Sequence, residues 1–284
     1  MIDIQNLTFN YSGGKDILKD FSLQINEPGI YGLLGKNGAG KSTLLYLIMG
    51  LLFPNKGEIR IDGIDPSLRL PETMENMFIV PEEYNLPGIP LTKYIKALRP
   101  FYPRWSDEIL RHNLDSFQMP LDTHLGALSM GQKKKIYMSV ALATNTHYLL
   151  MDEPTNGLDI PSKSQFRKAV SGSMDDEKTI IISTHQVRDV ELLLDHLTVI
   201  DQSNILLNAS MTSLGQHLNF IDINKQELPN DVIYKEESLQ GYAAIAPNHG
   251  GEDEESPVRL ELLFNALLTD AEAIRKVLER EKHI

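Results

Sequence analysis

A glycine-rich segment near the amino terminus constrains this chain more than any other feature. Residues 35–43 read Gly-Lys-Asn-Gly-Ala-Gly-Lys-Ser-Thr and fit the phosphate-loop pattern G-x-x-x-x-G-K-[ST]. The apolar run Gly29–Leu34 before the loop is typical of a buried strand, and Ser42–Leu52 after it has the composition of a buried helix. A strand, a glycine loop and a helix in this order predict an α/β fold with a phosphate-binding site.

The residue types in the loop suit the binding of a nucleoside triphosphate. Glycines let backbone amides converge on phosphate oxygens, and the helix N-terminus adds partial positive charge. Lys41 would reach the β- and γ-phosphates, and the Ser42 hydroxyl would ligate Mg²⁺. The loop residues that we expect to contact ATP are Gly35, Lys36, Asn37, Gly38, Ala39, Gly40, Lys41, Ser42 and Thr43.

Two carboxylates follow a second buried strand, Tyr148–Met151. Ligands of open α/β sheets bind at the carboxyl ends of the strands, so Asp152 and Glu153 should face the phosphate loop. We expect Asp152 to hold Mg²⁺ and Glu153 to act as the general base that polarises the attacking water. Taken alone, the segment could equally be an ordinary polar strand end before Pro154.

His185 closes a further buried strand that contains Ile180–Ile182. The other histidines show no metal-ligand spacing, so the sequence predicts no zinc site. A lone histidine is usually structural, but this one ends a strand of the same predicted sheet. Its imidazole could therefore contact a γ-phosphate and orient the water.

Composition and charge exclude several classes of protein. The chain of 284 residues has no cysteine, which excludes disulfide scaffolds and thiolate metal sites. Its longest uncharged apolar run, Leu44–Phe53, is much shorter than the about 18 residues of a membrane span. The start, Met1–Asn6, lacks the features of a signal peptide, so we expect a soluble cytoplasmic protein. The net charge of −12 argues against binding to duplex DNA.

Strand and helix patterns alternate through the middle of the chain, which predicts a largely parallel sheet flanked by helices. Alternating residues near Ile2–Ile4 and in Phe21–Ile25 indicate half-buried strands ahead of it. Ser106 is a good N-cap for one of the expected helices. The helices expected after the phosphate-loop helix are Leu91–Leu98, Asp107–Phe117, 130–145 and Val187–Leu194, and a further strand is expected at Leu197–Ile200.

A composition shift near residue 210 marks a candidate boundary. Residues 211–284 hold seven Lys or Arg against fourteen Asp or Glu, whereas the first 210 residues hold 20 against 25. Beyond residue 218 we expect strands at Phe220–Ile223 and Tyr242–Ala246 and then two helices. Thr269 and Glu272 predict a capping box at the start of the last helix.

Four further segments resemble one family. Leu128-Ser129-Met130-Gly131-Gln132 resembles the LSGGQ signature of ATP-binding cassette (ABC) ATPases, with Met130 in place of the first glycine. Asn156–Asp159 looks like the D-loop of that family, His185 sits like its switch histidine, and Tyr11 matches the aromatic residue that stacks on adenine. The resemblance covers about residues 1–212.

The resemblance implies a fold and a domain organisation. The expected fold is a P-loop NTPase cassette of the α/β class, with an antiparallel β subdomain, a mostly parallel core sheet and a helical subdomain at about 86–145. Residues 213–284 would be a small α+β C-terminal extension. The family also implies a second cassette, identical or different, so that two cassettes enclose two ATP molecules. The residues that would address the partner's ATP are Ser129, Met130, Gly131, Gln132 and Asp159.

The lysine run and one acidic residue near these motifs need separate interpretation. Residues 133–135, all lysine, follow the signature and form either a solvated helix face or a source of phosphate attraction. Glu82 stands where the family usually has its Q-loop glutamine. A carboxylate there could still ligand Mg²⁺, but it adds negative charge beside Asp152 and Glu153.

The resemblance finally implies a role in transport. The departures at Glu82 and Met130, together with the C-terminal extension, resemble the bacterial drug, peptide and antibiotic exporter branch. We therefore expect the ATPase subunit of an exporter, peripheral on the inner face of the cell membrane through a separate permease and without a nucleic-acid partner. Residues 86–127 would dock on the permease, where Phe101, Tyr102 and Trp105 either line the docking surface or form subdomain core.

Two other functions remain open at this point. One is a soluble ABC ATPase in DNA repair or translation, which the single cassette and the absence of a basic patch disfavour. The other is a nucleotide-binding regulatory module with little turnover, which the presence of Glu153 and His185 disfavours.

Overall fold

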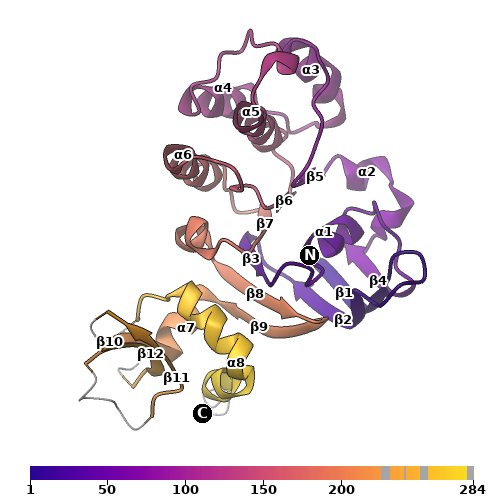
Figure 1. Cartoon of the computed structure of the whole chain (residues 1–284). Coiled ribbons are helices and arrows are strands. Elements are labelled where there is room, and N and C mark those ends of the chain that lie inside the picture. Colours follow the sequence, from indigo (N-terminus) through magenta and orange to yellow (C-terminus); the bar gives the residue numbers. More distant parts are fainter. Residues whose placement is uncertain (225–230, 240, 250–254, 280–284) are drawn as a thin grey trace.

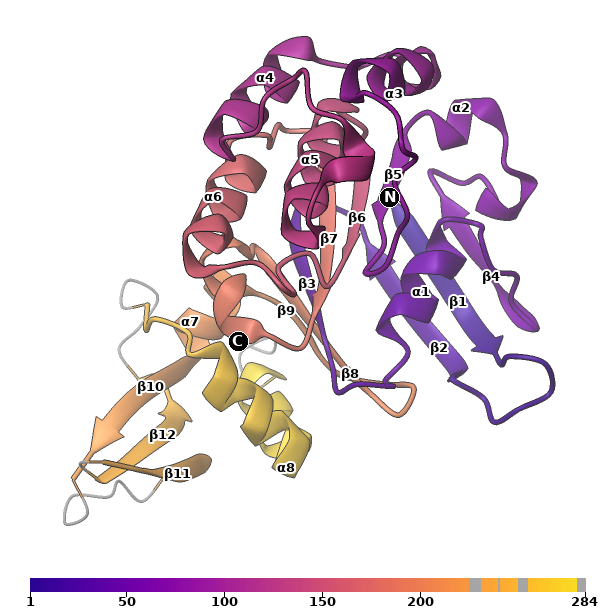
Figure 2. The ribbon, with the colours of Figure 1, turned by 45° about the horizontal axis from the view of Figure 1, so that its top comes forward.

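A six-stranded sheet forms the centre of the protein, as Figures 1 and 2 show. The computed structural model describes residues 1–224, 231–239, 241–249 and 255–279. Five strands of the sheet are parallel and the sixth pairs antiparallel with the fifth. In spatial order they are β5 (Met77–Val80), β6 (Tyr148–Asp152), β7 (Thr179–Thr184), β3 (Gly29–Leu34), β8 (His196–Asp201) and β9 (Asn204–Ser210). The predicted mostly parallel α/β core is confirmed.

A second sheet of three antiparallel strands lies over the first helix. Its order is β2 (Leu18–Ile25), β1 (Ile2–Phe9) and β4 (Lys56–Ile61). Buried and exposed residues alternate along most of β2, as expected for a sheet with one solvated face. Its buried face packs against α1 (Lys41–Ile48) in one hydrophobic cluster. The predicted antiparallel subdomain is therefore confirmed.

Helix α1 ends at Ile48, four residues before the predicted end at Leu52. Gly50 adopts a φ of 61°, which ends the helical path. A Cβ atom at this position would lie 2.3 Å from the carbonyl oxygen of Pro66, so only glycine fits there.

The segment between the phosphate loop and β6 is mainly helical. Ser106 caps one of its helices as predicted, because its Oγ accepts a hydrogen bond of 3.2 Å from the amide of Ile109. Besides α1, β4 and β5, this segment contains η1 (Pro66–Leu68), α2 (Pro71–Met74), α3 (Leu91–Leu98), η2 (Arg99–Phe101), α4 (Asp107–Ser116), η3 (Leu125–Ala127) and α5 (Met130–Ala143).

The predicted helix over Val187–Leu194 is wrong. Two 3-10 turns, η4 (Val187–Asp189) and η5 (Glu191–Leu193), follow β7 instead. The buried residues Val187, Val190 and Leu193 recur every three positions, which suits three residues per turn. α6 (Ile160–Ser171), which was not predicted, contacts η5.

The C-terminal part combines a small sheet with two helices. The predicted strands are present as β10 (Leu218–Ile223) and β12 (Gly241–Pro247), and β11 (Tyr234–Ser238) pairs with β12. α7 (Met211–His217) precedes this sheet and α8 (Leu260–Glu279) follows it. The predicted domain boundary after residue 212 falls inside α7 and stays a prediction, since one hydrophobic cluster contains residues from both sides of it.

The predicted capping box of Thr269 and Glu272 is wrong. α8 contains a break at Asp270, whose φ is −153° and ψ is 84°. The Asp270 Oδ1 atom accepts a hydrogen bond of 3.1 Å from the amide of Ala273, whereas the Thr269 hydroxyl donates to the carbonyl of Asn265. Asp270 therefore caps the second half of the helix, one residue later than predicted.

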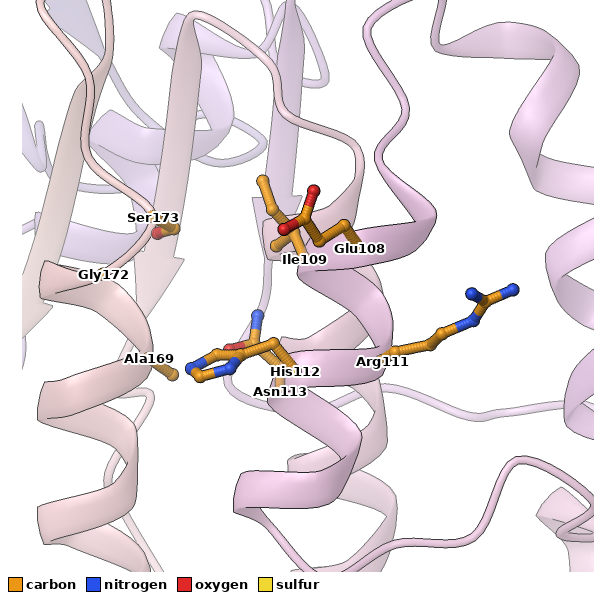
Figure 3. Close-up of a pocket in the computed structure, with 8 residues that line it drawn as sticks. All are labelled: Glu108, Ile109, Arg111, His112, Asn113, Ala169, Gly172 and Ser173. Atoms are coloured by element: carbon orange, nitrogen blue, oxygen red, sulfur yellow. The ribbon is translucent and has the colours of Figure 1, made fainter.

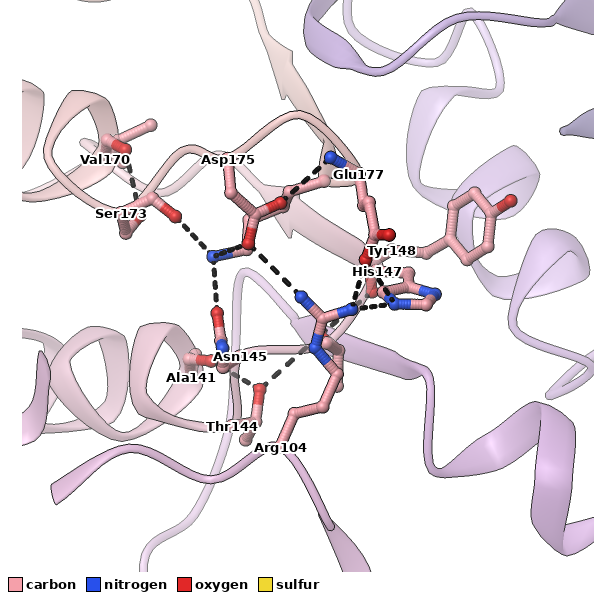
Figure 4. Close-up of polar contacts among 12 residues, drawn as sticks. Arg104, Ala141, Thr144, Asn145, His147, Tyr148, Val170, Ser173, Asp175 and Glu177 are labelled. Carbon is pink, nitrogen blue, oxygen red and sulfur yellow. Dashed lines mark hydrogen bonds and ion pairs between the residues drawn. The ribbon is translucent and has the colours of Figure 1, made fainter.

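A polar network ties the helical segment to the loop before β7. Arg104 pairs with Asp175 at 3.2 Å and with Glu177 at 3.0 Å, and it also contacts His147 (Figure 4). Next to it, the Lys178 side chain is only 2% exposed and donates to Asn145 Oδ1 at 2.8 Å and to the carbonyl of Ser173. Burial lowers the pKa of Lys178.

Replacing Lys178 by alanine should destabilise the fold. The buried carbonyl of Ser173 and the partly buried amide oxygen of Asn145 lose their donor. Each such loss costs up to about 1–3 kcal/mol, so we expect the free energy of unfolding to fall by about 2–4 kcal/mol. Urea denaturation followed by circular dichroism measures this change. Lys93→Ala, at an exposed position of α3, is the control and should change stability by less than about 0.5 kcal/mol. Equal stability of the two variants would contradict the prediction.

Candidate functional site

The phosphate loop forms a cradle between β3 and α1. Gly38 and Gly40 have φ values of 82° and 96°, so the backbone turns in the left-handed region that favours glycine. Gly35 lets the loop backbone lie close to β8, because a Cβ atom at this position would lie 2.6 Å from the carbonyl oxygen of Ile200. The amides at the start of α1 carry no side-chain cap, so they remain available to an anion.

The Lys41 ammonium lies inside this loop. Its Nζ atom donates to the carbonyls of Gly35 at 2.8 Å and Lys36 at 3.3 Å. The residue is 6% exposed, and burial lowers the pKa of Lys41, while nearby carboxylates, Glu153 foremost, oppose the lowering. A lysine positioned in this way supplies one positive charge to phosphate oxygens.

Glu153 and His185 meet at the ends of β6 and β7. His185 Nδ1 lies 2.7 Å from Glu153 Oε1, and the His185 amide donates to the same oxygen at 3.0 Å. The Thr184 hydroxyl donates to Oε2 at 2.9 Å. Glu153 is 5% exposed, and its Oε1 atom lies 3.9 Å from Lys41 Nζ. The carboxylate is thus held in a fixed orientation beside the phosphate loop.

Asp152 lies deeper than Glu153. It is 1% exposed and pairs across the sheet with Ser183, whose hydroxyl donates to the Asp152 carboxylate. Burial of a carboxylate is tolerated here because it is hydrogen-bonded. Its position at the end of β6 agrees with the expectation that Asp152 holds Mg²⁺, which stays a prediction.

A cavity of about 490 Å³ joins the phosphate loop to the ends of β6 and β7. It brings together predicted site residues that are separated by more than a hundred positions in the sequence. Ile17 and Asn156, which were not predicted as site residues, also line it. The lining residues are Ile17, Asn37, Gly38, Gly40, Lys41, Ser42, Thr43, Glu82, Glu153, Asn156 and His185.

Glu82 reaches the same cavity from the loop after β5. Its Oε1 atom accepts a hydrogen bond of 3.0 Å from Asn156 Nδ2. This hydrogen bond connects Glu82, which stands in place of the family's Q-loop glutamine, to the segment after Glu153. With Ser42 and Glu82 both lining the cavity, hard oxygen donors are available for Mg²⁺.

Tyr11 lies at the outer edge of the loop. It is 48% exposed, and its hydroxyl lies 3.2 Å from the hydroxyl of buried Thr43. The edge of its ring contacts Phe9. The exposed ring leaves room for a flat base, as the predicted adenine contact requires, and that contact stays a prediction.

The signature residues lie outside the cavity. Ser129 and Gln132 form a capping box at the start of α5, with the Ser129 amide donating to Gln132 Oε1 at 3.0 Å. Met130 is 69% exposed, and no atom lies within 4 Å of a Cβ built on Gly131. The capping box occupies the amides of Ser129 and Gln132, so the amides of Met130 and Gly131 are the ones that could meet an external anion. Asp159 caps α6 through a 2.9 Å bond from Ser162, and the bonds from Ser162 lower the pKa of Asp159.

One lysine of the run after the signature, Lys134, has a different arrangement from either predicted one. Lys134 is 8% exposed, and its Nζ atom donates to the carbonyls of Glu153 at 3.0 Å and Asn156 at 2.8 Å. This residue thus belongs neither to a solvated face nor to a phosphate-attracting one. No sequence pattern indicated that Lys134 is buried or that the hydroxyls of Ser183 and Thr184 hold the two carboxylates.

A larger cavity of about 680 Å³ lies between α4 and α6 (Figure 3). His112 and Asn113 on α4 face Ala169 on α6, whereas Arg111 points away. None of the phosphate-loop residues or carboxylates described above lines it. Size alone therefore does not identify the functional site, and the chemistry favours the smaller cavity.

Comparisons with known proteins agree with this geometry. A family model described as ABC transporter matches residues 18–156. The uncharacterized ABC transporter ATP-binding protein YdbJ of Bacillus subtilis is 30% identical over 76% of this chain and 72% of its own length. The methionine import ATP-binding protein MetN of Carboxydothermus hydrogenoformans is 30% identical over 83% of this chain and 73% of its own.

A solved structure matches as well. CbiO1 from Clostridium perfringens, part of the ABC transporter complex CbiONQ, superposes with a TM-score of 0.62 at 27% identity. The match covers 74% of this chain and 88% of CbiO1.

Replacing Lys41 by alanine should weaken ATP binding at least about tenfold, because one buried cation beside the phosphates is lost. Titration of the purified chain with a fluorescent ATP analogue measures the dissociation constant. Lys19→Ala, at an exposed position of β2 outside the loop, is the matched control and should stay within about threefold of wild type. Normal affinity of the Lys41→Ala chain would contradict the assignment of the loop.

Proposed function

The chain belongs to the ABC transporter family of ATPases, and from this premise we propose that it is the ATP-hydrolysing subunit of a membrane transporter. The observation that carries the proposal is the single cavity in which Lys41, Glu153 and His185 meet. A phosphate cradle alone would serve a nucleotide sensor, but a fixed carboxylate beside it serves hydrolysis.

The loop residues bind and orient the triphosphate. Backbone amides of the loop and of the first turn of α1 would donate to the β- and γ-phosphate oxygens, and Lys41 would exchange carbonyl partners for phosphate oxygens. Ser42, Asp152 and Glu82 are the residues that would hold Mg²⁺, which neutralises charge on the phosphates. The exposed Tyr11 ring would stack on the adenine.

Glu153 accepts the proton of the attacking water in this mechanism. Three donors from Thr184 and His185 fix its carboxylate, so little reorganisation precedes the reaction. His185 binds the Oε1 atom of Glu153, which would also contact the attacking water. The exposed edge of the His185 ring would orient the γ-phosphate. This arrangement also disfavours a regulatory module with little turnover, which would have no use for a positioned base.

We propose that two cassettes act together. The signature amides at the start of α5 lie outside the cavity of their own chain, as expected for groups that serve a partner. Ser129, Gly131 and Asp159 would then approach the ATP of the opposite cassette. The Gln132 side chain is engaged in the capping box, so its contribution would be to orient those amides.

A separate permease would carry the substrate. None of the helices in the described part of the chain is long and apolar enough to cross a membrane. On the predicted docking surface, residues 86–127, Phe101 is 70% exposed. Tyr102 and Trp105 instead pack against the core, so Phe101 is the aromatic residue available to a partner.

Export is the direction that we propose. It rests on the departures at Glu82 and Met130, while MetN is a methionine importer by name, so membership of the family does not decide the direction. ATP-dependent uptake into inside-out vesicles that contain both subunits would support export. Uptake into right-side-out vesicles would contradict it.

Replacing Glu153 by glutamine should keep ATP binding but slow hydrolysis at least about a hundredfold, because an amide accepts no proton. The bound ATP would then hold two cassettes together, so gel filtration with light scattering should show an ATP-dependent dimer. Glu83→Gln, an exposed neighbour of the site, is the control and should hydrolyse ATP normally. Hydrolysis at the wild-type rate by Glu153→Gln would contradict its role as the base.

Replacing Phe101 by aspartate should reduce the amount of permease that co-purifies with the tagged chain from membranes, because a charge replaces an apolar contact. Leu68→Asp, at a position that is 62% exposed and lies outside residues 86–127, is the control. ATPase activity of the isolated chain should stay unchanged in both variants. Equal recovery of the permease with both variants would contradict docking at Phe101.

A further inference from the structure

Lys134 is a buried cation beside the catalytic carboxylate that the proposed mechanism does not use. Lys134 is the fifth residue of α5 and is 8% exposed. Its Nζ atom donates to two backbone carbonyls of the segment after β6, those of Glu153 and Asn156. A buried lysine that donates to two backbone carbonyls fixes the path of that backbone.

The backbone that Lys134 holds is unusual. Glu153 has a φ of 45°, in the left-handed region that residues other than glycine rarely adopt. Such a conformation persists only when its surroundings enforce it. The amide of Glu153 is bound to the carbonyl of Ser183 at 3.0 Å, and Lys134 binds the carbonyl on the other side. The two contacts together set the direction in which the Glu153 carboxylate leaves the strand.

The charge of Lys134 also has a partner. Burial lowers the pKa of Lys134, and Glu82 is the foremost of the carboxylates that oppose this lowering. Glu82 binds Asn156 through its side chain, and Lys134 binds Asn156 through its carbonyl. Both residues line a pocket of about 230 Å³ between the loop after β5 and the start of α5. The exposed carboxylate of Glu82 therefore has a buried cation on the wall of the same pocket.

We propose that Lys134 is a positioning residue for Glu153 and that its charge offsets the carboxylate of Glu82, so that the two residues act as one functional pair. The inference rests on the proposed ATPase function. It explains how the cavity accommodates a third acidic residue beside Asp152 and Glu153. It also makes the signature helix, through Lys134, one of the supports of the catalytic carboxylate.

The first test replaces Lys134 by methionine, which keeps the length of the side chain and removes its charge and donors. We expect kcat for ATP hydrolysis to fall at least about tenfold, while KM for MgATP stays within about threefold, because Lys134 orients the base and touches no phosphate. Lys133→Met, its more exposed neighbour, is the matched control and should keep its kcat within about twofold. Unchanged kcat in Lys134→Met would overturn the proposal.

The second test measures the pair. Glu82→Gln and Lys134→Gln are made singly and together, and Lys134→Gln keeps a donor in case the methionine variant fails to fold. We expect the double variant to hydrolyse ATP at least about threefold faster than the product of the two single effects predicts, because neither unbalanced charge remains. If the rate of the double variant equals the product of the two single effects, the pairing of Lys134 with Glu82 is overturned.

Thermal melts and binding of a fluorescent ATP analogue distinguish the failures. A wild-type chain that binds but does not hydrolyse ATP would overturn the proposed function and this inference with it. A wild-type chain with normal hydrolysis, together with a folded Lys134→Met chain of equal kcat, would overturn this inference alone.

Discussion

The parallel pairing of β3, β6 and β7 is the constraint on which the rest of the site depends. Leu34 pairs with Thr184 and Asp152 pairs with Ser183, so the three strands end at the same level. The chain leaves β3 into the phosphate loop, β6 into Glu153 and β7 into His185. Because hydrogen bonds fix this register, three segments far apart in the sequence reach one cavity without any flexible element between them.

Much of this arrangement could be predicted from the sequence, because the residues that define it are local. The loop pattern at Gly35–Thr43 and the apolar strands before it and before Asp152 are continuous in the chain, and the helix Leu91–Leu98 was predicted with its bounds. The wrongly predicted helix after β7 also has a physical explanation. Val187–Leu194 has enough apolar residues for an α-helix, but their spacing of three favours 3-10 turns.

The supports of the site could not be predicted, because they arise from contacts between distant segments. Ser183 and Thr184 look like ordinary β-branched or small strand residues until the pairing with β6 brings them to the carboxylates. Lys134 is one of three consecutive lysines, and only the packing of α5 against the end of β6 decides which of them is buried. The acidic residue at position 82 was visible, but the cation near it was not.

The charges in the cavity explain how an acidic protein can bind a triphosphate. Glu82 and Glu153 line the cavity together with Lys41, and the buried residues Asp152 and Lys134 lie close to it. These three carboxylates and two lysines carry a small excess of negative charge. An anion would be repelled by this set. Attraction must therefore come from the backbone amides of the loop and the N-terminus of α1. Under the proposed function, the nucleotide enters as its Mg²⁺ complex, and the net charge of −12 on the whole chain is compatible with tight binding because the field that matters is local.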